Sequence, residues 1–440
     1  MRKNKGITLI ALIITIVVML ILVAVSVNII INSNIIGQAE KAAEGYKTAY
    51  EQEANGGEIE INGKKYGSVE EYLAEKENLP EIEAGTRATE PSEYKSNNKT
   101  AVIPAGFTVS GISTEQSIDG GLVIYDIPEG TTVNWTNPDS VKTQYNQFVW
   151  IPVEVNKTTE PKDTETSIAS FYRTAWANNA STGGERTTGL NTGYTEPYSY
   201  DSSDYDGTGT GKTGISAQIT ELTKSIYKYG GFYIGRYEAG SETKRGDVSS
   251  QTAAFVVQQD KYPYNYVEWG KGMGDVSEGA VYLSNSLYTG KTGYGVKSML
   301  CTGAAWDSML DFIKDSSHSV TNSTTWGNYE NSDTYKVYRG SLYSNSNWSA
   351  ADTTNGSDVT KGTSILLTTG ANKRNSSKNI YDVAGNCAEW TTEAVNTSYR
   401  VVRGGVYVNN GSYAPASYRI LGYPTYGDVF SFRPLLYVAL

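Results

Sequence analysis

The sequence predicts an α+β protein in which a long N-terminal helix precedes a large domain of many short strands. Three observations predict it. Residues 7–31 contain no charged side chain, residues 100–440 alternate short apolar runs with long polar loops, and Thr302–Asp315 shows most clearly the apolar spacing of a soluble amphipathic helix. At 440 residues the chain can hold one large domain or two to three ordinary ones.

The first element is a helix over residues 7–52. At about 1.5 Å per residue, its uncharged first half is long enough to cross a bilayer. Arg2, Lys3 and Lys5 precede it and orient the N-terminus toward the cytoplasm. A secretory signal peptide would have a shorter apolar region ending at a small-residue cleavage site, and neither is evident. We therefore expect a membrane anchor whose Ala-, Glu- and Lys-rich second half continues the helix outside the membrane.

The start of this helix also resembles the type IV prepilin leader. Residues 5–10 read KGITLI, and the resemblance implies that a prepilin peptidase removes residues 1–6 by cutting between Gly6 and Ile7. Such pilins usually carry a glutamate at the fifth mature position, but Ala11 stands here. An apolar residue avoids the cost of a charge in the membrane but removes a contact with neighbouring subunits. The resemblance implies other pilin subunits as partners, and major, minor and non-filament roles stay open.

Residues 53–99 are expected to form a small hairpin–helix segment and a linker. Residues 58–66 read EIEINGKKY, two strands joined at Asn62-Gly63. Residues 68–71 form a capping box that opens a short helix ending near Lys76. A polar run with Pro80 and Pro91 then predicts a linker.

The second domain is expected over residues 100–440. Its predicted strands include Ala101–Pro104, Gly121–Ile127, Gln147–Val155 and Gly230–Glu238. Residues 156–214 are rich in Thr, Gly, Asn and Tyr and lack a hydrophobic period, which predicts an exposed insertion.

Composition limits the function. The 37 basic and 47 acidic residues give a net charge of −10, which argues against nucleic acid as a partner. His318 is the single histidine, so multi-histidine metal sites are excluded and Ser-His-Asp chemistry would rest on it alone. Cys301 and Cys387 fit one disulfide or two buried thiols equally well. The 34 tyrosines suit both β-rich structure and a binding surface.

Three segments of the second domain resemble the formylglycine-generating-enzyme-like domain, a variant of the C-type lectin fold. They read GGFYIGRYE at 230–238, NIYDVAGNCAEWT at 379–391 and RVVRGG at 400–405, the last followed by Arg419 and FSFRP at 430–434. The resemblance implies a calcium ion on Asn386 and Glu389, whose hard oxygens suit it. A salt bridge from Glu389 to an arginine is the alternative, and no other cofactor is expected. Trp390 is expected in the core, with Arg403, Arg419 and Arg433 fixing loops.

The same comparison argues against an enzyme. The generating enzyme holds copper with two cysteines after its Gly-Gly pair, but Asn409 and Ala414 stand at those positions. Soft-metal chemistry needs thiolates, which neither residue supplies.

Residues 400–434 also resemble the variable region of target proteins of diversity-generating retroelements. In such tails a constant frame of Gly, Arg and Pro alternates with positions that hold mixed aromatic and aliphatic residues. A single sequence cannot show variation, so ordinary drift stays the alternative. The predicted ligand-binding positions are Val406, Val408, Tyr413, Tyr418, Ile420, Leu421, Tyr423, Tyr426 and Asp428.

We therefore expect a pilin-like adhesin at the cell surface or pilus, anchored in the membrane by its N-terminal helix. Its lectin-like domain would bind a protein or glycan ligand without catalysis. The alternatives are a formylglycine-generating-type oxidase and a structural minor pilin.

Overall fold

The computed structural model divides the chain into two units, Met1–Glu75 and Lys76–Leu440. Its described residues are 59–61, 64–66, 78–155, 211–247, 249–270, 277–396, 399–423, 425 and 427–440. The predicted leader and stem helix, the short helix to Lys76 and the predicted insertion up to residue 210 lie outside these residues. None of the helices in the described ranges combines the length and hydropathy that crossing a membrane requires.

In the first unit the structure describes one hairpin. Strands β1 (Ile59–Ile61) and β2 (Lys64–Tyr66) are antiparallel, and Ile61 lies opposite Lys64. The Asn62-Gly63 dipeptide stands between these two paired residues in the sequence, and Asn-Gly is the pair that favours a tight hairpin connection. The predicted hairpin is confirmed.

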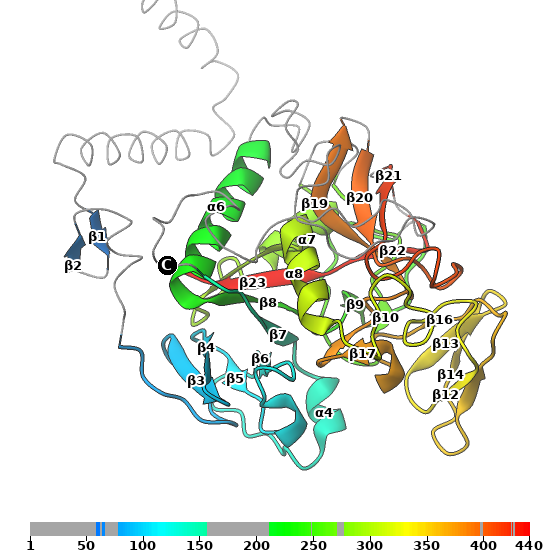
Figure 1. Ribbon diagram of the computed structural model, residues 1–440, viewed down its shortest axis with the longest axis horizontal. Coiled ribbons are helices and arrows are strands. Elements are labelled where there is room, and N and C mark those ends of the chain that lie inside the picture. The colour runs from blue at the N-terminus through cyan, green and yellow to red at the C-terminus, as the bar shows by residue number, and fades with distance from the viewer. Residues whose placement is uncertain are drawn as a thin grey trace, which may run out of the picture. The chain divides into compact units, whose positions relative to one another are not determined.

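The second unit is a mixed α+β structure with many strands and few helices, as the sequence predicts (Figure 1). A six-stranded sheet has the order β11-β23-β8-β7-β6-β5. Its strands are β5 (Thr108–Val109), β6 (Val123–Tyr125), β7 (Gln147–Pro152), β8 (Gly231–Gly235), β11 (Val296–Leu300) and β23 (Pro434–Val438). Strand β23 therefore joins β11 to β8, with Leu435 opposite both Met299 and Ile234.

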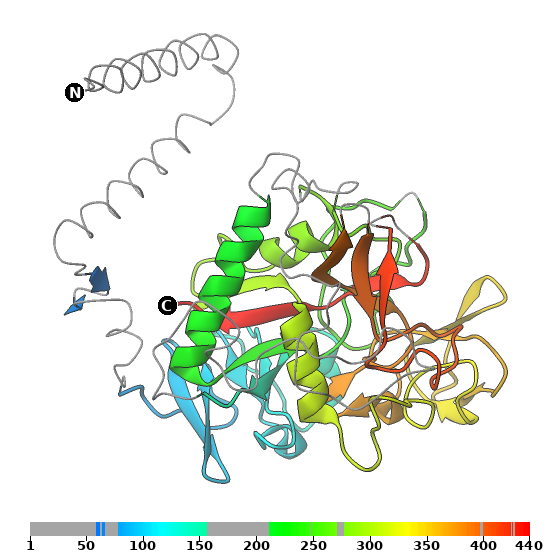
Figure 2. The same ribbon diagram turned by 45° about the horizontal axis from the view of Figure 1, so that its top comes forward.

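Both faces of this sheet are buried. On β8, Phe232 and Ile234 belong to one apolar cluster and Tyr233 to another, and β7 alternates in the same way. Helices α6 (Gly211–Tyr229) and α8 (Gly303–Ile313) contribute to the first cluster and α7 (Gly279–Ser286) to the second. Figure 2 shows α6 and α8 lying against the same side of the sheet. Because both faces are covered, these strands read as continuous apolar runs.

A second sheet of four strands carries the segment that sequence analysis singled out. Its order is β21-β20-β19-β22, with β19 and β22 parallel and the other neighbours antiparallel. The strands are β19 (Ala388–Asn396), β20 (Tyr399–Arg403), β21 (Arg419–Gly422) and β22 (Phe430–Phe432).

Smaller elements complete the second unit. Strands β13 (Ser341–Ser344), β14 (Asn347–Ala350) and β16 (Leu366–Leu367) form a three-stranded sheet. The paired strands are β3 (Ser92–Ser96) with β4 (Lys99–Ile103), β9 (Gly240–Ser241) with β10 (Tyr262–Pro263), β12 (Tyr335–Val337) with β15 (Ser357–Val359), and β17 (Ser376–Ser377) with β18 (Ile380–Tyr381). The short helices are α4 (Pro138–Lys142) and the 3₁₀ turns η2 (Ser113–Glu115) and η5 (Lys373–Asn375).

The four predicted strands correspond to β4, β6, β7 and β8, and the predicted helix corresponds to α8. Thr302 caps α8, because its side chain accepts a hydrogen bond from the Ala305 backbone N–H at 3.0 Å.

Two boundaries differ from the prediction. Helix α6 begins at Gly211, before the predicted end of the insertion at residue 214, and the sequence analysis missed it. The predicted domain boundary at residues 99/100 falls inside β4, whose pairing with β3 holds both sides of that boundary in the second unit.

Candidate binding surface

Two arginines and two carboxylates form the buried base of the four-stranded sheet. Arg403 on β20 donates to Asp307 at 2.7 Å and to Glu393 at 3.5 Å. Arg419 on β21 donates to the second oxygen of Asp307 at 2.9 Å and to Glu393 at 3.1 Å. All four side chains have no exposed surface. Since Asp307 lies on α8, this cluster ties the sheet to that helix.

Arg433 forms the second buried connection. Its Nε and Nη2 donate to the two oxygens of Glu389 at 2.9 and 2.5 Å, and Nη1 donates to the Gly235 carbonyl at 2.8 Å. The three arginines are buried and fork onto carboxylates as expected, but what Arg419 joins is a helix and a strand, through Asp307 and Glu393, and not loops. Trp390 is fully buried, as expected, and donates to the Val267 carbonyl at 3.0 Å.

The residues suggested for calcium have protein partners in this arrangement. Both oxygens of Glu389 accept from Arg433, which is the salt-bridge alternative. The Asn386 carbonyl oxygen accepts from Asn328 at 2.9 Å and from the Leu367 N–H at 3.0 Å. Within the described ranges, no group of three or more His, Cys, Asp or Glu residues is placed to hold a metal ion.

A tight backbone crossing positions the loop between β20 and β21. Gly405 has φ of +71°, and a Cβ there would lie 2.2 Å from the Ala414 carbonyl oxygen. Only glycine fits such a contact and adopts this backbone angle without strain. The crossing fixes the two ends of the turn that carries Val408 and Tyr413.

The structure separates the nine predicted binding positions into three groups. Val408, Tyr413, Ile420, Leu421 and Tyr423 are between 39% and 58% exposed, and Asp428 is also exposed. Val406 and Tyr418 are buried, so their assignment to the ligand-contacting surface is corrected, because both side chains point into the protein. Tyr426 lies outside the described residues.

Strand β21 exposes two neighbouring apolar side chains to solvent. Ile420 and Leu421 are adjacent and both exposed, although successive strand residues point to opposite faces. No described strand other than β20 pairs with β21, so it is an edge strand in this part of the chain. Open apolar side chains beside an unpaired backbone edge are suited to contact with another molecule.

Tyr399 belongs to the same surface, although sequence analysis missed it. Its ring centroid lies 4.5 Å from that of Tyr423, and the two hydroxyls are 2.6 Å apart. Tyr413 likewise lies 6.1 Å from the ring of the buried Tyr418. We name the half-buried Tyr399 and the exposed residues Val408, Tyr413, Ile420, Leu421, Tyr423 and Asp428 together the C-terminal surface.

The residues that a catalytic function would need, at the copper-site positions, the two cysteines and the single histidine, are held in ordinary contacts within the protein. Asn409 turns its side-chain oxygen back to the Val406 N–H at 3.3 Å, and Ala414 is buried. Cys301 and Cys387 are buried thiols that form no disulfide, and they lie in separate apolar clusters. Nδ1 of His318 lies 2.9 Å from Asp315, and no hydroxyl or thiol of the described residues hydrogen-bonds to its ring.

Comparisons with known proteins add little to this geometry. No protein-family model matches the sequence, and no curated protein matches it. Among solved structures, the chain is similar to Treponema denticola variable protein 1, with 13% identity and a TM-score of 0.26 over 47% of this chain and 84% of that one. A likeness this weak establishes neither a fold nor a function for this chain.

Proposed function

We propose that the chain is a cell-surface, pilin-like adhesin or receptor whose lectin-like domain binds a protein or glycan ligand through the C-terminal surface. One observation carries the proposal. Five large apolar or aromatic side chains predicted from the sequence as ligand contacts stand exposed on a short stretch of chain above buried arginine–carboxylate pairs.

The physical argument is that of a preorganised binding patch. Exposed tyrosines supply a large contact area, and removing rigid aromatic anchors from water provides most of the binding energy in protein interfaces. The buried pairs beneath them fix the backbone, so little conformational freedom remains to be lost on binding. Asp428 and the hydroxyls of Tyr399 and Tyr423 provide polar groups that orient a ligand.

The N-terminal segment supports the location in this proposal. The leader-like KGITLI sequence and the uncharged residues 7–31 fit processing between Gly6 and Ile7 by a prepilin peptidase, followed by membrane anchoring and contact with other pilin subunits. The proposal includes no catalytic step, because Asn409 and Ala414 stand where a copper enzyme of the resembling family needs thiolates.

Binding by the C-terminal surface is tested with purified full-length protein on beads, probed against a glycan array and against intact bacterial and host cells. The variant Tyr413→Ala/Tyr423→Ala should lose at least about 100-fold in apparent affinity, since each hot-spot aromatic contributes roughly 2 kcal/mol or more. Circular dichroism and the denaturation midpoint should match the unaltered protein, because both side chains are exposed.

Tyr338→Ala is the matched control, because Tyr338 is an equally exposed tyrosine outside the C-terminal surface. It should leave binding unchanged. Equal binding by the double variant and the unaltered protein would contradict the site assignment. Stoichiometric copper or iron in the purified protein would instead favour the oxidase.

Diversification is tested by deep sequencing of the gene from the codon of Arg400 to that of Pro434 in a growing population. Substitutions clustered at the nine binding positions predicted from the sequence, with Arg403, Gly405 and Arg419 unchanged, are expected for a diversified receptor. A uniform sequence would point to a fixed adhesin or a structural tip protein.

A further inference from the structure

A cavity elsewhere in the second unit is not used by the C-terminal surface. It has a volume of about 570 Å³, within the size range of small-molecule sites. Its walls come from η2, from the loop after α8 and from the turn that contains η5, β17 and β18. None of the nine predicted binding positions lines it.

The charge of this cavity is opposite to that of the protein. Its lining includes two carboxylates, Glu115 and Asp315, against five cations: Lys142, Arg236, Lys373, Arg374 and Lys378. With neutral His318, the lining has a formal charge of +3, whereas the whole chain has −10. Positive charge concentrated in a concave site attracts anions from a distance.

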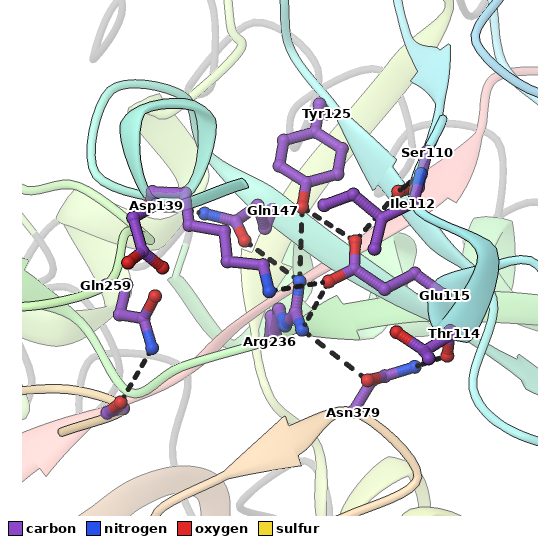
Figure 3. A network of polar contacts seen from close by, with 12 residues as sticks. Ser110, Ile112, Thr114, Glu115, Tyr125, Asp139, Gln147, Arg236, Gln259 and Asn379 are labelled. Atoms are coloured by element: carbon purple, nitrogen blue, oxygen red, sulfur yellow. Dashed lines mark hydrogen bonds and ion pairs between the residues drawn. The ribbon is translucent and has the colours of Figure 1, made fainter. Parts of the chain in front are cut away.

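At one wall, Glu115 is already neutralised. Figure 3 shows its carboxylate between Arg236, at 2.8 Å, and the Tyr125 hydroxyl, at 2.7 Å. Lys142 lies 3.0 Å from the same carboxylate. Burial alone would raise the pKa of Glu115, but Arg236 and Lys142 lower it to about 2. The single negative charge of Glu115 is therefore shared by the two positive charges of Arg236 and Lys142, and this wall of the cavity keeps a net positive charge.

Two other lysines of the lining have no such partner. No described carboxylate lies within salt-bridge distance of Lys373 or Lys378. Lys378 is half-buried, and its ammonium lies 4.2 Å from the Phe312 ring centroid. In addition, Nε of Arg236 is buried without a hydrogen-bond partner in the described part of the chain. A buried donor without a partner calls for an explanation, and a bound water or anion is one.

The wall that carries Lys378 is rigidly placed. The side-chain amide of Asn379 donates to the carbonyls of Gly121 at 2.8 Å, Thr114 at 3.2 Å and Gly120 at 3.3 Å. A Cβ on Gly121 would lie 1.8 Å from the Lys378 carbonyl oxygen, so the two backbones are in contact. The two sides of the cavity are therefore fixed relative to each other before any ligand arrives.

The remaining lining indicates what the anion is attached to. It includes the hydroxyl-bearing residues Thr114, Ser317 and Thr325 and the aromatic residues Trp326 and Tyr381. The volume far exceeds that of one phosphate or sulfate ion, and hydroxyl groups pair well with hydroxyls. We propose that this cavity binds an anionic, hydroxyl-rich small molecule, such as a sugar that carries a phosphate, sulfate or carboxylate group.

The test uses purified full-length protein and isothermal titration calorimetry. Glucose 6-phosphate, glucose 6-sulfate and galacturonic acid are the probes, with glucose and inorganic phosphate as matched comparisons. The charged sugars should bind at least tenfold more tightly than either comparison. Their affinities should fall as salt rises, because the attraction is electrostatic. Preference for the phosphate would indicate a sugar phosphate, and preference for the sulfate or carboxylate would indicate an acidic surface polysaccharide.

The variant Lys373→Gln/Lys378→Asn removes both unpaired charges. Lys378 has φ of +45°, a backbone angle that asparagine tolerates, so the fold should be retained. It should weaken binding of the charged sugars at least tenfold, whereas Lys361→Gln, an exposed lysine outside the cavity, should not. Binding of glucose as tight as that of its phosphate, or unchanged affinity in the double lysine variant, would overturn the proposal. Tyr413→Ala/Tyr423→Ala should keep sugar binding, which separates this proposal from the previous one.

Discussion

Arg403 and Arg419 lie directly opposite each other on β20 and β21, and both donate to Asp307 and Glu393. Two like charges paired across neighbouring strands repel each other. Here the two shared carboxylates neutralise them, so a pair that would separate the strands joins both to α8. The C-terminal surface rests on this arrangement.

Asp307→Ala is expected to destabilise the protein by about 3–5 kcal/mol, because it leaves two buried guanidinium groups with one carboxylate between them. Denaturant unfolding of the full-length chain measures the loss. Asp358→Ala removes an exposed partner of Lys336 and should change stability by less than about 1 kcal/mol. Equal stability of the two variants would contradict the structural role of Asp307.

Gly405→Ala is expected to cost more than Gly362→Ala, although both positions have positive φ. At Gly362, with φ of +85°, a Cβ would meet nothing within 4 Å, so only backbone strain of about 1–2 kcal/mol applies. At Gly405 the new methyl group would also collide with the Ala414 carbonyl. Thermal unfolding of both variants measures the difference, and similar losses would show that the crossing tolerates a side chain.

The stability of the protein should fall as pH rises from about 4 to about 7. Burial raises the pKa of Asp382 from 3.8 to about 7, with nearby Glu389 adding to the shift and Arg433 and the Gly370 N–H opposing it. Burial, together with Asp382 and Glu389, also raises the pKa of Glu238. The folded state therefore holds protons that the unfolded chain has released, and stability is lost as pH rises through this window.

Asp382→Asn should reduce that loss by roughly 1–3 kcal/mol between pH 5 and 7, at about 1.4 kcal/mol per pH unit. Asparagine tolerates the φ of +60° and keeps an acceptor for the Gly370 N–H. Urea midpoints at several pH values provide the measurement. If the variant showed the same pH dependence of stability as the unaltered protein, Asp382 would not be the group that titrates in this range. Glu115 acts in the opposite direction only below about pH 4.5, because its pKa is lowered to about 2.

Both cysteines should stay unreactive in the folded protein. Burial raises the pKa of the Cys387 thiol, and the neighbouring carboxylates Glu238, Glu389 and Asp382 raise it further. The thiolate is the reactive form, so a thiol reagent should label neither cysteine under native conditions and both in denaturant without reductant. A single label or none in denaturant would instead indicate a disulfide or a modified cysteine.

The sequence predicts those elements that are determined by residues close together in the chain. The run Phe148–Ile151 predicts a buried strand, and the spacing of Ala305, Met309 and Ile313 predicts α8. Asn62-Gly63 predicts the hairpin. Helix α6 could have been found from Ile215, Ile219, Leu222 and Ile226, which follow helical spacing, but the polar residues before it masked the period.

What the sequence could not predict depends on contacts between distant segments. The loop between β20 and β21 has no regular hydrophobic period. The sequence therefore does not predict that Val406 and Tyr418 are buried while Val408 and Tyr413 are exposed. The cationic cavity is built from residues near positions 115, 142, 236, 318 and 378, which no local pattern connects. Their charges are diluted in an acidic sequence and only the fold concentrates them.

The position of β23 has a consequence for how such a surface can change. This strand follows the C-terminal surface in the chain and is the only described link between β11 and β8. A frameshift or stop codon within residues 406–429 removes it and leaves two unpaired apolar strand edges, which favour aggregation and degradation. Substitutions that keep the reading frame leave it intact. Folding thus acts as a reading-frame check on residues 406–429, because a chain with a broken frame lacks the strand that completes the six-stranded sheet.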